Sequence, residues 1–243
     1  MKYIIANWKN YPQNFEQTFS LAEKILKKLK EINGAVNFIL CPPNVFLRDL
    51  IKEFPKINFG AQNLFLEEKN PCTGEISGKM LKNLGCKFAI VGHSERRNFF
   101  NESDKIINKK IKICLANKIT PIFCIGETLE ENKNQQTFSV LKKQIEKGLE
   151  KINLKNKEIL IAYEPIWSIG TGKIASIENL KNIKDYLKDI ANLKGFDKAK
   201  IIYGGSVDAK NTSQILSEAG FDGLLIGKNS FDFKEFEKIL NNL

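Results

Sequence analysis

At 243 residues, with 42% hydrophobic and 27% charged side chains, the chain has the composition of a globular protein with a sizeable core, not that of a disordered chain. Its formal charge of +10 comes almost entirely from lysines scattered over expected helix surfaces, without basic stripes interleaved with aromatics, so no nucleic-acid partner is expected. No segment approaches the roughly 20 apolar residues of a membrane span and no signal-type segment opens the chain, so a cytoplasmic protein without a membrane partner is expected.

Eight short segments rich in β-branched and aliphatic residues are predicted to be strands. They are Tyr3–Asn7, Val36–Cys41, Ile57–Ala61, Phe88–Gly92, Thr120–Ile125, Ile159–Glu164, Lys200–Gly204 and Gly223–Gly227. Most are continuous apolar runs, which is typical of parallel strands covered on both faces. The amphipathic segments between them are predicted to be helices, at residues 14–32, 45–54, 77–84, 103–116, 135–152, 177–193, 209–219 and 233–240.

This alternation of strand and helix runs through residues 1–243 without a composition break or a low-complexity linker. It predicts a single α/β domain, a (β/α)8 barrel of eight parallel strands ringed by helices. An open, doubly wound sheet is the alternative. In a barrel, chemistry takes place where the strands end at their carboxyl side and the loops begin, so the residues at those positions are the functional candidates.

Cysteine and histidine are too sparse for a clustered metal site. The five cysteines are odd in number and include no Cys-x-x-Cys pair, which argues against a disulfide framework and against zinc. His93 is the only histidine, so a histidine-rich site is excluded as well. We therefore expect reduced thiols and no metal.

Two side chains suited to proton transfer stand at expected strand ends. His93 follows the fourth strand; a lone histidine is more often structural, but this position favours catalysis. Glu164 ends the sixth strand after an apolar run, and a carboxylate at a partly dry rim suits a general base. The alternative for Glu164 is a surface carboxylate paired with a lysine.

The segment after Glu164, residues 165–173, combines an apolar tip with Gly-Thr-Gly, as in a lid that closes over a ligand. It fails as a Walker-type phosphate loop, because Trp167 and Ile174 occupy positions that the motif reserves for glycine and for serine or threonine.

Three other strand ends point to an anionic substrate. Lys9 and Asn7 close the first strand, and Lys9 is either a fixed cation for the substrate or one more surface charge. Glycines follow the seventh and eighth strands, at 204–205 and 227, where backbone N–H groups could approach a phosphate. Taken alone, Gly-Gly-Ser could equally be a simple turn.

Together, and in this order along almost the whole chain, the motifs closely resemble the triosephosphate isomerase family. They are Asn7-Trp8-Lys9, Gly92-His93-Ser94-Glu95-Arg96-Arg97, Cys124-Ile125-Gly126-Glu127, Ala162-Tyr163-Glu164-Pro165-Ile166-Trp167, Gly170-Thr171-Gly172-Lys173 and Tyr203-Gly204-Gly205-Ser206-Val207. The resemblance implies the cofactor-free interconversion of dihydroxyacetone phosphate and D-glyceraldehyde 3-phosphate through an enediolate, in glycolysis and gluconeogenesis.

The resemblance also assigns roles. Glu164 would remove the proton next to the carbonyl, and His93 would polarise the carbonyl as a neutral imidazole at the start of a helix that begins at Ser94. Lys9 would stabilise the enediolate, with Asn7 helping to set the site. The residues implied in substrate binding are Asn7, Lys9, Gly170, Ser206, Gly227 and the backbone N–H of Lys228.

Gln62-Asn63 and residues 72–75 resemble the family's protruding third loop, whose tip, with Thr73, enters the neighbouring subunit near Asn7 and Lys9. The resemblance therefore implies a homodimer; without it, an ordinary exposed loop would be the preferred interpretation.

The chain departs from the family pattern at two places. Lys9 is followed by Asn10-Tyr11-Pro12 where the family usually has Met-Asn-Gly, which alters the first loop and its dimer contact. Lys228 replaces the second of two glycines after the eighth strand. Its backbone donor is kept, and its side chain either points to solvent or adds charge to the site.

Two rival functions are weighed against this one. Another phosphate-binding barrel isomerase would share the phosphate clamp but lack the pair of His93 and Glu164. A basic binding protein built on an inactive barrel would need none of Lys9, His93 and Glu164 together, so their presence argues against it.

Overall fold

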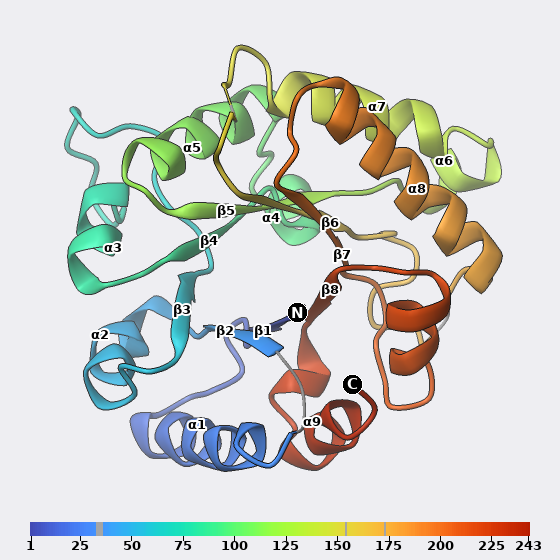
Figure 1. The fold of residues 1–243 in the computed structure, drawn as a ribbon. Helices are drawn as coiled ribbons and strands as arrows, with labels where there is room; N and C mark the ends of the chain where they lie inside the picture. Colours follow the sequence, from blue (N-terminus) through green and yellow to red (C-terminus); the bar gives the residue numbers. More distant parts are fainter. Residues whose placement is uncertain (33–35, 154, 173) are drawn as a thin grey trace.

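The computed structural model describes residues 1–32, 36–153, 155–172 and 174–243, and its strands form a closed parallel barrel (Figure 1). The strands are β1 (Lys2–Asn7), β2 (Val36–Cys41), β3 (Asn58–Ala61), β4 (Phe88–Val91), β5 (Thr120–Ile125), β6 (Ile159–Tyr163), β7 (Ala199–Tyr203) and β8 (Gly223–Ile226). Each strand pairs with its neighbour in sequence, and β8 pairs with β1. The predicted barrel is confirmed, and the open sheet is wrong because the first and last strands are joined.

Closure depends on how near β8 approaches β1. The two strands pair in register from Tyr3 opposite Gly223 to Ala6 opposite Ile226. A Cβ atom at position 223 would collide with the backbone of Tyr3, so glycine is required where the strands meet.

Helices surround the barrel in the view of Figure 1. They are α1 (Phe15–Leu29), α2 (Asn44–Glu53), α3 (Gly78–Leu84), α4 (Ser94–Phe99), α5 (Asp104–Ala116), α6 (Leu129–Lys133), α7 (Thr137–Gly148), α8 (Ile177–Leu193) and α9 (Phe233–Leu240), with the π-helix η1 (Gln214–Glu218) and the 3₁₀-helix η2 (Lys228–Ser230). The predicted helix at 209–219 is shorter and mostly of another type: residues 209–211 form a turn, residues 212–213 are α-helical and residues 214–218 form a π-helix. The short helix α6 was not predicted.

The apolar strands supply two cores. Alternate residues of β1 show the division: Ile5 packs inside the barrel, whereas Ile4 and Ala6 face the surrounding helices. Both faces of each strand are thus buried, which explains the continuous apolar runs.

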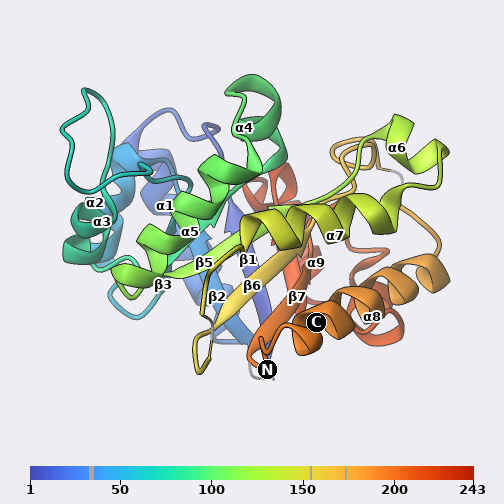
Figure 2. The ribbon, with the colours of Figure 1, turned by 90° about the horizontal axis from the view of Figure 1, so that it is seen from above.

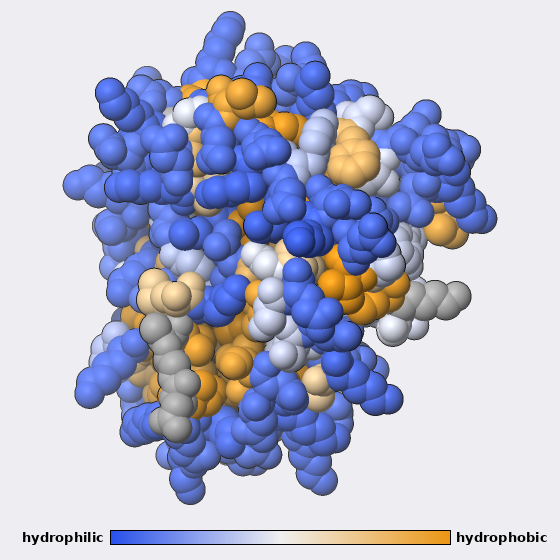
Figure 3. Space-filling model, turned by 45° about the vertical axis from the view of Figure 1, so that its right-hand side comes forward, coloured by the Kyte–Doolittle hydropathy of each residue, from blue (hydrophilic) through white to orange (hydrophobic). Residues whose placement is uncertain are grey.

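On the face shown in Figure 3, hydrophilic side chains predominate and hydrophobic patches lie between them. Among the described helices, none is long and apolar enough to cross a membrane.

The two ends of the barrel differ. In Figure 2, α4 lies at one end and the N-terminus at the other, and the loop between β3 and α3 projects at the end where α4 lies. Because α4 follows directly on β4, this is the end at which the parallel strands finish. The residues predicted to carry function follow the strands there.

Candidate active site

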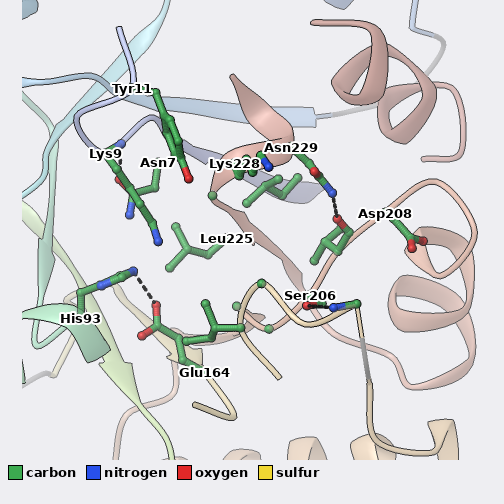
Figure 4. Close-up of a pocket in the computed structure, with 18 residues that line it drawn as sticks. Asn7, Lys9, Tyr11, His93, Glu164, Ser206, Asp208, Leu225, Lys228 and Asn229 are labelled. Atoms are coloured by element: carbon green, nitrogen blue, oxygen red, sulfur yellow. Dashed lines mark hydrogen bonds and ion pairs between the residues drawn. The ribbon is translucent and has the colours of Figure 1, made fainter. Parts of the chain in front are cut away.

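A cavity of about 490 Å³ opens at the carboxyl ends of the strands (Figure 4). All eight residues predicted to act on or bind the substrate line it: Asn7, Lys9, His93, Glu164, Gly170, Ser206, Gly227 and Lys228. They lie at or after the ends of five strands, β1, β4, β6, β7 and β8, and only barrel closure brings them together.

Glu164 is the most deeply placed carboxylate of this cavity, with 2% of its surface exposed. Its backbone N–H donates to the carbonyl of Ile125 on the neighbouring strand at 2.7 Å. Its Oε2 accepts a hydrogen bond from the backbone N–H of Ser94 at 3.1 Å, and its Oε1 lies 3.5 Å from Nε2 of His93. The expected dry surroundings of this side chain are therefore present, and the surface-carboxylate alternative is wrong.

Two glycine residues make room for Glu164. A Cβ atom at Gly126 would overlap the backbone of Glu164, and one at Gly204 would lie 2.8 Å from the Cγ of Glu164. The backbone and side chain of Glu164 thus fit between two neighbouring strand ends because both carry glycine there.

His93 caps the helix that follows it. Its Nδ1 accepts a hydrogen bond from the backbone N–H of Glu95 at 3.2 Å, at the start of α4. A ring nitrogen that accepts a hydrogen bond carries no proton, so in this arrangement the imidazole is neutral and its N–H is at Nε2. That N–H faces Glu164 and the cavity (Figure 4).

Lys9 has a left-handed backbone, with φ of 48°, which is unusual for a residue with a side chain and costs about 1–3 kcal/mol. Two side chains hold this conformation: Asn7 Oδ1 accepts from the Lys9 N–H at 3.1 Å, and Gln62 Nε2 donates to the Lys9 carbonyl at 2.8 Å. The ammonium pairs with Glu95 at 2.5 Å, which joins β1 to α4. Glu95 belongs to the segment that follows the fourth strand, but nothing in the sequence indicates that it pairs with Lys9.

The lid residues 165–172 lie against the loop after β7. The N–H of Gly172 donates to Ser206 Oγ at 3.2 Å, and Ser206 Oγ donates to the carbonyl of Ser168 at 2.5 Å. Gly170 and Gly172 both have left-handed backbones, which only glycine adopts without strain. The predicted end of the lid, Lys173, lies outside the described residues.

The base of the lid is tied to a buried carboxylate that sequence reasoning missed. Glu127 Oε1 accepts from Trp167 Nε1 at 2.8 Å and from the Tyr163 hydroxyl at 3.2 Å. The pKa of Glu127 is raised overall, because burial raises it more than these hydrogen-bond donors lower it.

The thiol of Cys124 also lies beside the site. Burial and the nearby Glu164 raise the pKa of Cys124 well above its usual value, so this thiol stays protonated.

A second cavity, of about 550 Å³, adjoins Lys9 on the side away from the lid. Its lining includes Gln62, Asn10 and Tyr11 of the altered first loop, and the exposed rings of Phe99 and Phe100. Thr73 does not line either cavity; it lies on the exposed loop between β3 and α3.

The fold and the cavity together define a class of protein: a barrel enzyme in which a buried carboxylate and a neutral imidazole face one ligand space, beside a fixed ammonium and glycine-rich loops suited to an anion. Among the described residues, no group of three or more His, Cys, Asp or Glu side chains could hold a metal ion.

Comparison with known proteins identifies the family. The model of the triosephosphate isomerase family matches residues 2–243. Triosephosphate isomerases of Endomicrobium trichonymphae and Alkaliphilus metalliredigens are each 41% identical to the chain over 98% of its length, and the matches cover 96% and 98% of those relatives. The crystal structure of the triosephosphate isomerase from Bartonella henselae superposes with a TM-score of 0.88 at 29% identity, covering 99% of this chain and 98% of that one.

The chain therefore belongs to the triosephosphate isomerase family. It is an isomerase of glycolysis and gluconeogenesis that interconverts dihydroxyacetone phosphate and D-glyceraldehyde 3-phosphate.

Proposed function

We propose that this reaction takes place in the cavity of about 490 Å³, with Glu164 as the base, His93 as the electrophile, and Lys9 and Asn7 as the groups that stabilise the enediolate. The observation that carries the proposal is the 3.5 Å approach of His93 Nε2 to Glu164 Oε1, in a lining that also includes Lys9. Substitution of Glu164 by alanine, with turnover and phosphate binding measured separately, tests it.

The carboxylate of Glu164 takes the proton from the substrate carbon next to the carbonyl. The electron pair of that C–H bond forms the carbon–carbon double bond of the enediolate, and the carbonyl oxygen becomes negative. Glu164 then returns the proton to the neighbouring carbon. Its burial suits this task, because bulk water is kept away from the carboxylate and from the enediolate that forms beside it.

The neutral imidazole of His93 donates its Nε2–H towards the developing oxyanion. The same ring can give a proton to one substrate oxygen and receive one from the other, which moves the hydroxyl hydrogen between the two oxygens. Lys9 and Asn7 face the same space from β1 and offer a positive charge and a side-chain amide. Donors held in place in this way stabilise the enediolate without reorganising during the reaction.

The phosphate is bound at the other side of the cavity, by the N–H groups of Gly170 and Lys228, with Ser206 and Gly227 beside them. The start of η2 leaves the first backbone N–H groups without helical partners, which suits an anion. The lid closes over this end and keeps water from the enediolate.

Replacing His93 by glutamine is expected to lower kcat by about 10²–10³-fold, as for the loss of one oxyanion donor. The amide keeps a donor group but cannot pass a proton between the substrate oxygens. Steady-state kinetics in both directions measure the effect, and glutamine substitution of the exposed Asn242 is the control. A KM increase with unchanged kcat would contradict the role of His93.

We further propose that the enzyme is a homodimer, with Thr73 entering the cavity of about 550 Å³ beside Lys9 in the partner. The exposed rings of Phe99 and Phe100, 77% and 63% accessible, border this cavity and are unfavourable in water. A partner loop there would cover them and hold the loop that carries Lys9.

Thr73→Arg is therefore expected to give a monomer with kcat lowered at least about tenfold, because the partner loop no longer holds the loop that carries Lys9. Sedimentation velocity gives the mass, and Ser217→Arg, on the exposed side of η1, is the matched control. A wild-type monomer with full activity would refute the dimer.

We also infer that the chain forms one domain and acts in the cytoplasm. The pairing of β1 with β8 and the core shared by all eight strand-helix units support a single domain. Five free cysteines, of which only Cys72 is exposed, suit a reducing compartment.

A further inference from the structure

Lys228 occupies an unusual position for a charged side chain. It follows Gly227 at the end of β8, and it lines the same cavity as Gly170 and Ser206. In Figure 4 it lies between Tyr11 and Asn229 at the edge of that cavity. The side chain is exposed, and nothing in the catalytic mechanism described above uses its ammonium group.

The backbone that carries Lys228 is firmly held. Ser230 is fully buried, and its Oγ lies 3.0 Å from the carbonyl of Ile226 and 2.7 Å from that of Gly227. Trp8 Nε1 donates to the Ser230 carbonyl at 3.1 Å, and Asn229 Nδ2 donates to the carbonyl of Val207 at 2.7 Å. The Lys228 side chain is therefore mounted on a fixed base beside the loop that carries Ser206.

The charges of the lining leave Lys228 unmatched. The cavity lining contains two carboxylates, Glu164 and Asp208. Glu164 faces His93 in the catalytic pair. Asp208 accepts hydrogen bonds from the N–H groups of Lys210 and Asn211 at 2.8 and 3.0 Å. The other lysine, Lys9, pairs with Glu95. Among the described residues, the ion pairs within 4.0 Å include none with Lys228.

We propose that the ammonium group of Lys228 is a second cation of the active site, which binds the substrate's phosphate directly and favours doubly charged phosphates over singly charged or neutral ligands. The inference rests on the proposed phosphate end of the cavity. There the other donors are neutral N–H groups, and the ammonium adds a full charge that a dianion attracts most strongly. Because the side chain is exposed, salt screens the attraction.

The test uses inorganic phosphate as a competitive inhibitor of glyceraldehyde 3-phosphate turnover, at low ionic strength and in about 0.5 M salt. Lys228→Gln is expected to raise the inhibition constant about fivefold at low salt, with little difference at high salt. Lys228→Arg keeps the charge and is expected to stay near wild type. Lys234→Gln removes one exposed charge from α9, away from the cavity lining, and is the matched control for net charge.

The preference for a phosphorylated substrate is measured by comparing kcat/KM for two substrates. In Lys228→Gln, kcat/KM for glyceraldehyde 3-phosphate is expected to fall relative to kcat/KM for unphosphorylated glyceraldehyde. The proposal is overturned if Lys228→Gln and Lys234→Gln give the same phosphate inhibition, or if Lys228→Gly binds phosphate more tightly than wild type, since the side chain would then be an obstruction. Either result leaves wild-type turnover and its dependence on Glu164 intact, so failure here is distinct from failure of the catalytic assignment.

Discussion

Glu164→Ala is expected to lower kcat by about 10³–10⁴-fold while inorganic phosphate still binds with nearly unchanged affinity. The carboxylate contacts Ser94 and His93 at one side of the cavity, whereas the loops proposed to bind phosphate lie at the other. Removing it deletes the base and leaves the anion-binding groups in place. A coupled assay that detects dihydroxyacetone phosphate measures turnover.

Two further variants sharpen this result. Glu164→Asp keeps a carboxylate but withdraws it by about one bond length, and a displacement of about 1 Å costs about 10²-fold in rate. Its activity should therefore lie between wild type and alanine. Glu23→Ala, on the exposed face of α1, controls for loss of a negative charge. Equal losses of phosphate affinity and turnover in Glu164→Ala would contradict its assignment as a base.

Lys9→Ala is expected to lower kcat/KM by about 10³-fold, through both kcat and KM. The variant removes the fixed cation and also leaves the Glu95 carboxylate, 2.5 Å from the ammonium in wild type, to repel an anionic substrate. The expected loss is therefore larger than the loss of one hydrogen bond.

A double-mutant cycle separates the two contributions. Lys9→Ala with Glu95→Gln should recover part of the activity, because the repelling charge is gone. Lys24→Ala, exposed on α1, removes a positive charge elsewhere and should remain near wild type. If Lys24→Ala loses as much activity as Lys9→Ala, the general positive field of the protein, and not Lys9, attracts the substrate.

The sequence predicted the barrel well because its strands are buried on both faces. Continuous apolar runs such as Ile159–Tyr163 mark such strands, and the residues that end them were candidates for that reason alone. Helix α6 is too short to show periodicity, although Thr128 and Glu131 form a capping box that could have indicated its start. The π-helix η1 buries Ile215 and Leu216 on one side, as an α-helix could, so the sequence pattern does not reveal its different hydrogen bonding.

The details of the site were less predictable, since they arise from contacts between distant segments. The left-handed backbone of Lys9 is held by Gln62, and the lid's Trp167 is held by Glu127. Nothing at Lys9 or Trp167 alone indicates these partners. The family resemblance named the residues, whereas their mutual distances came from the structure.

The pairing of β1 with β8 also bears on when the site can exist during synthesis. Asn7 and Lys9 leave the ribosome before the other residues of the site, and the Gly227 and Lys228 that stand beside them in the cavity emerge more than 200 residues later. When His93 and Glu164 have been synthesised but β8 has not, the sheet is still open and the edge of β1 that pairs with β8 has no partner. Catalytic competence is therefore a property of the last stage of folding, and the unpaired β1 edge is where an incomplete chain is most exposed to aggregation.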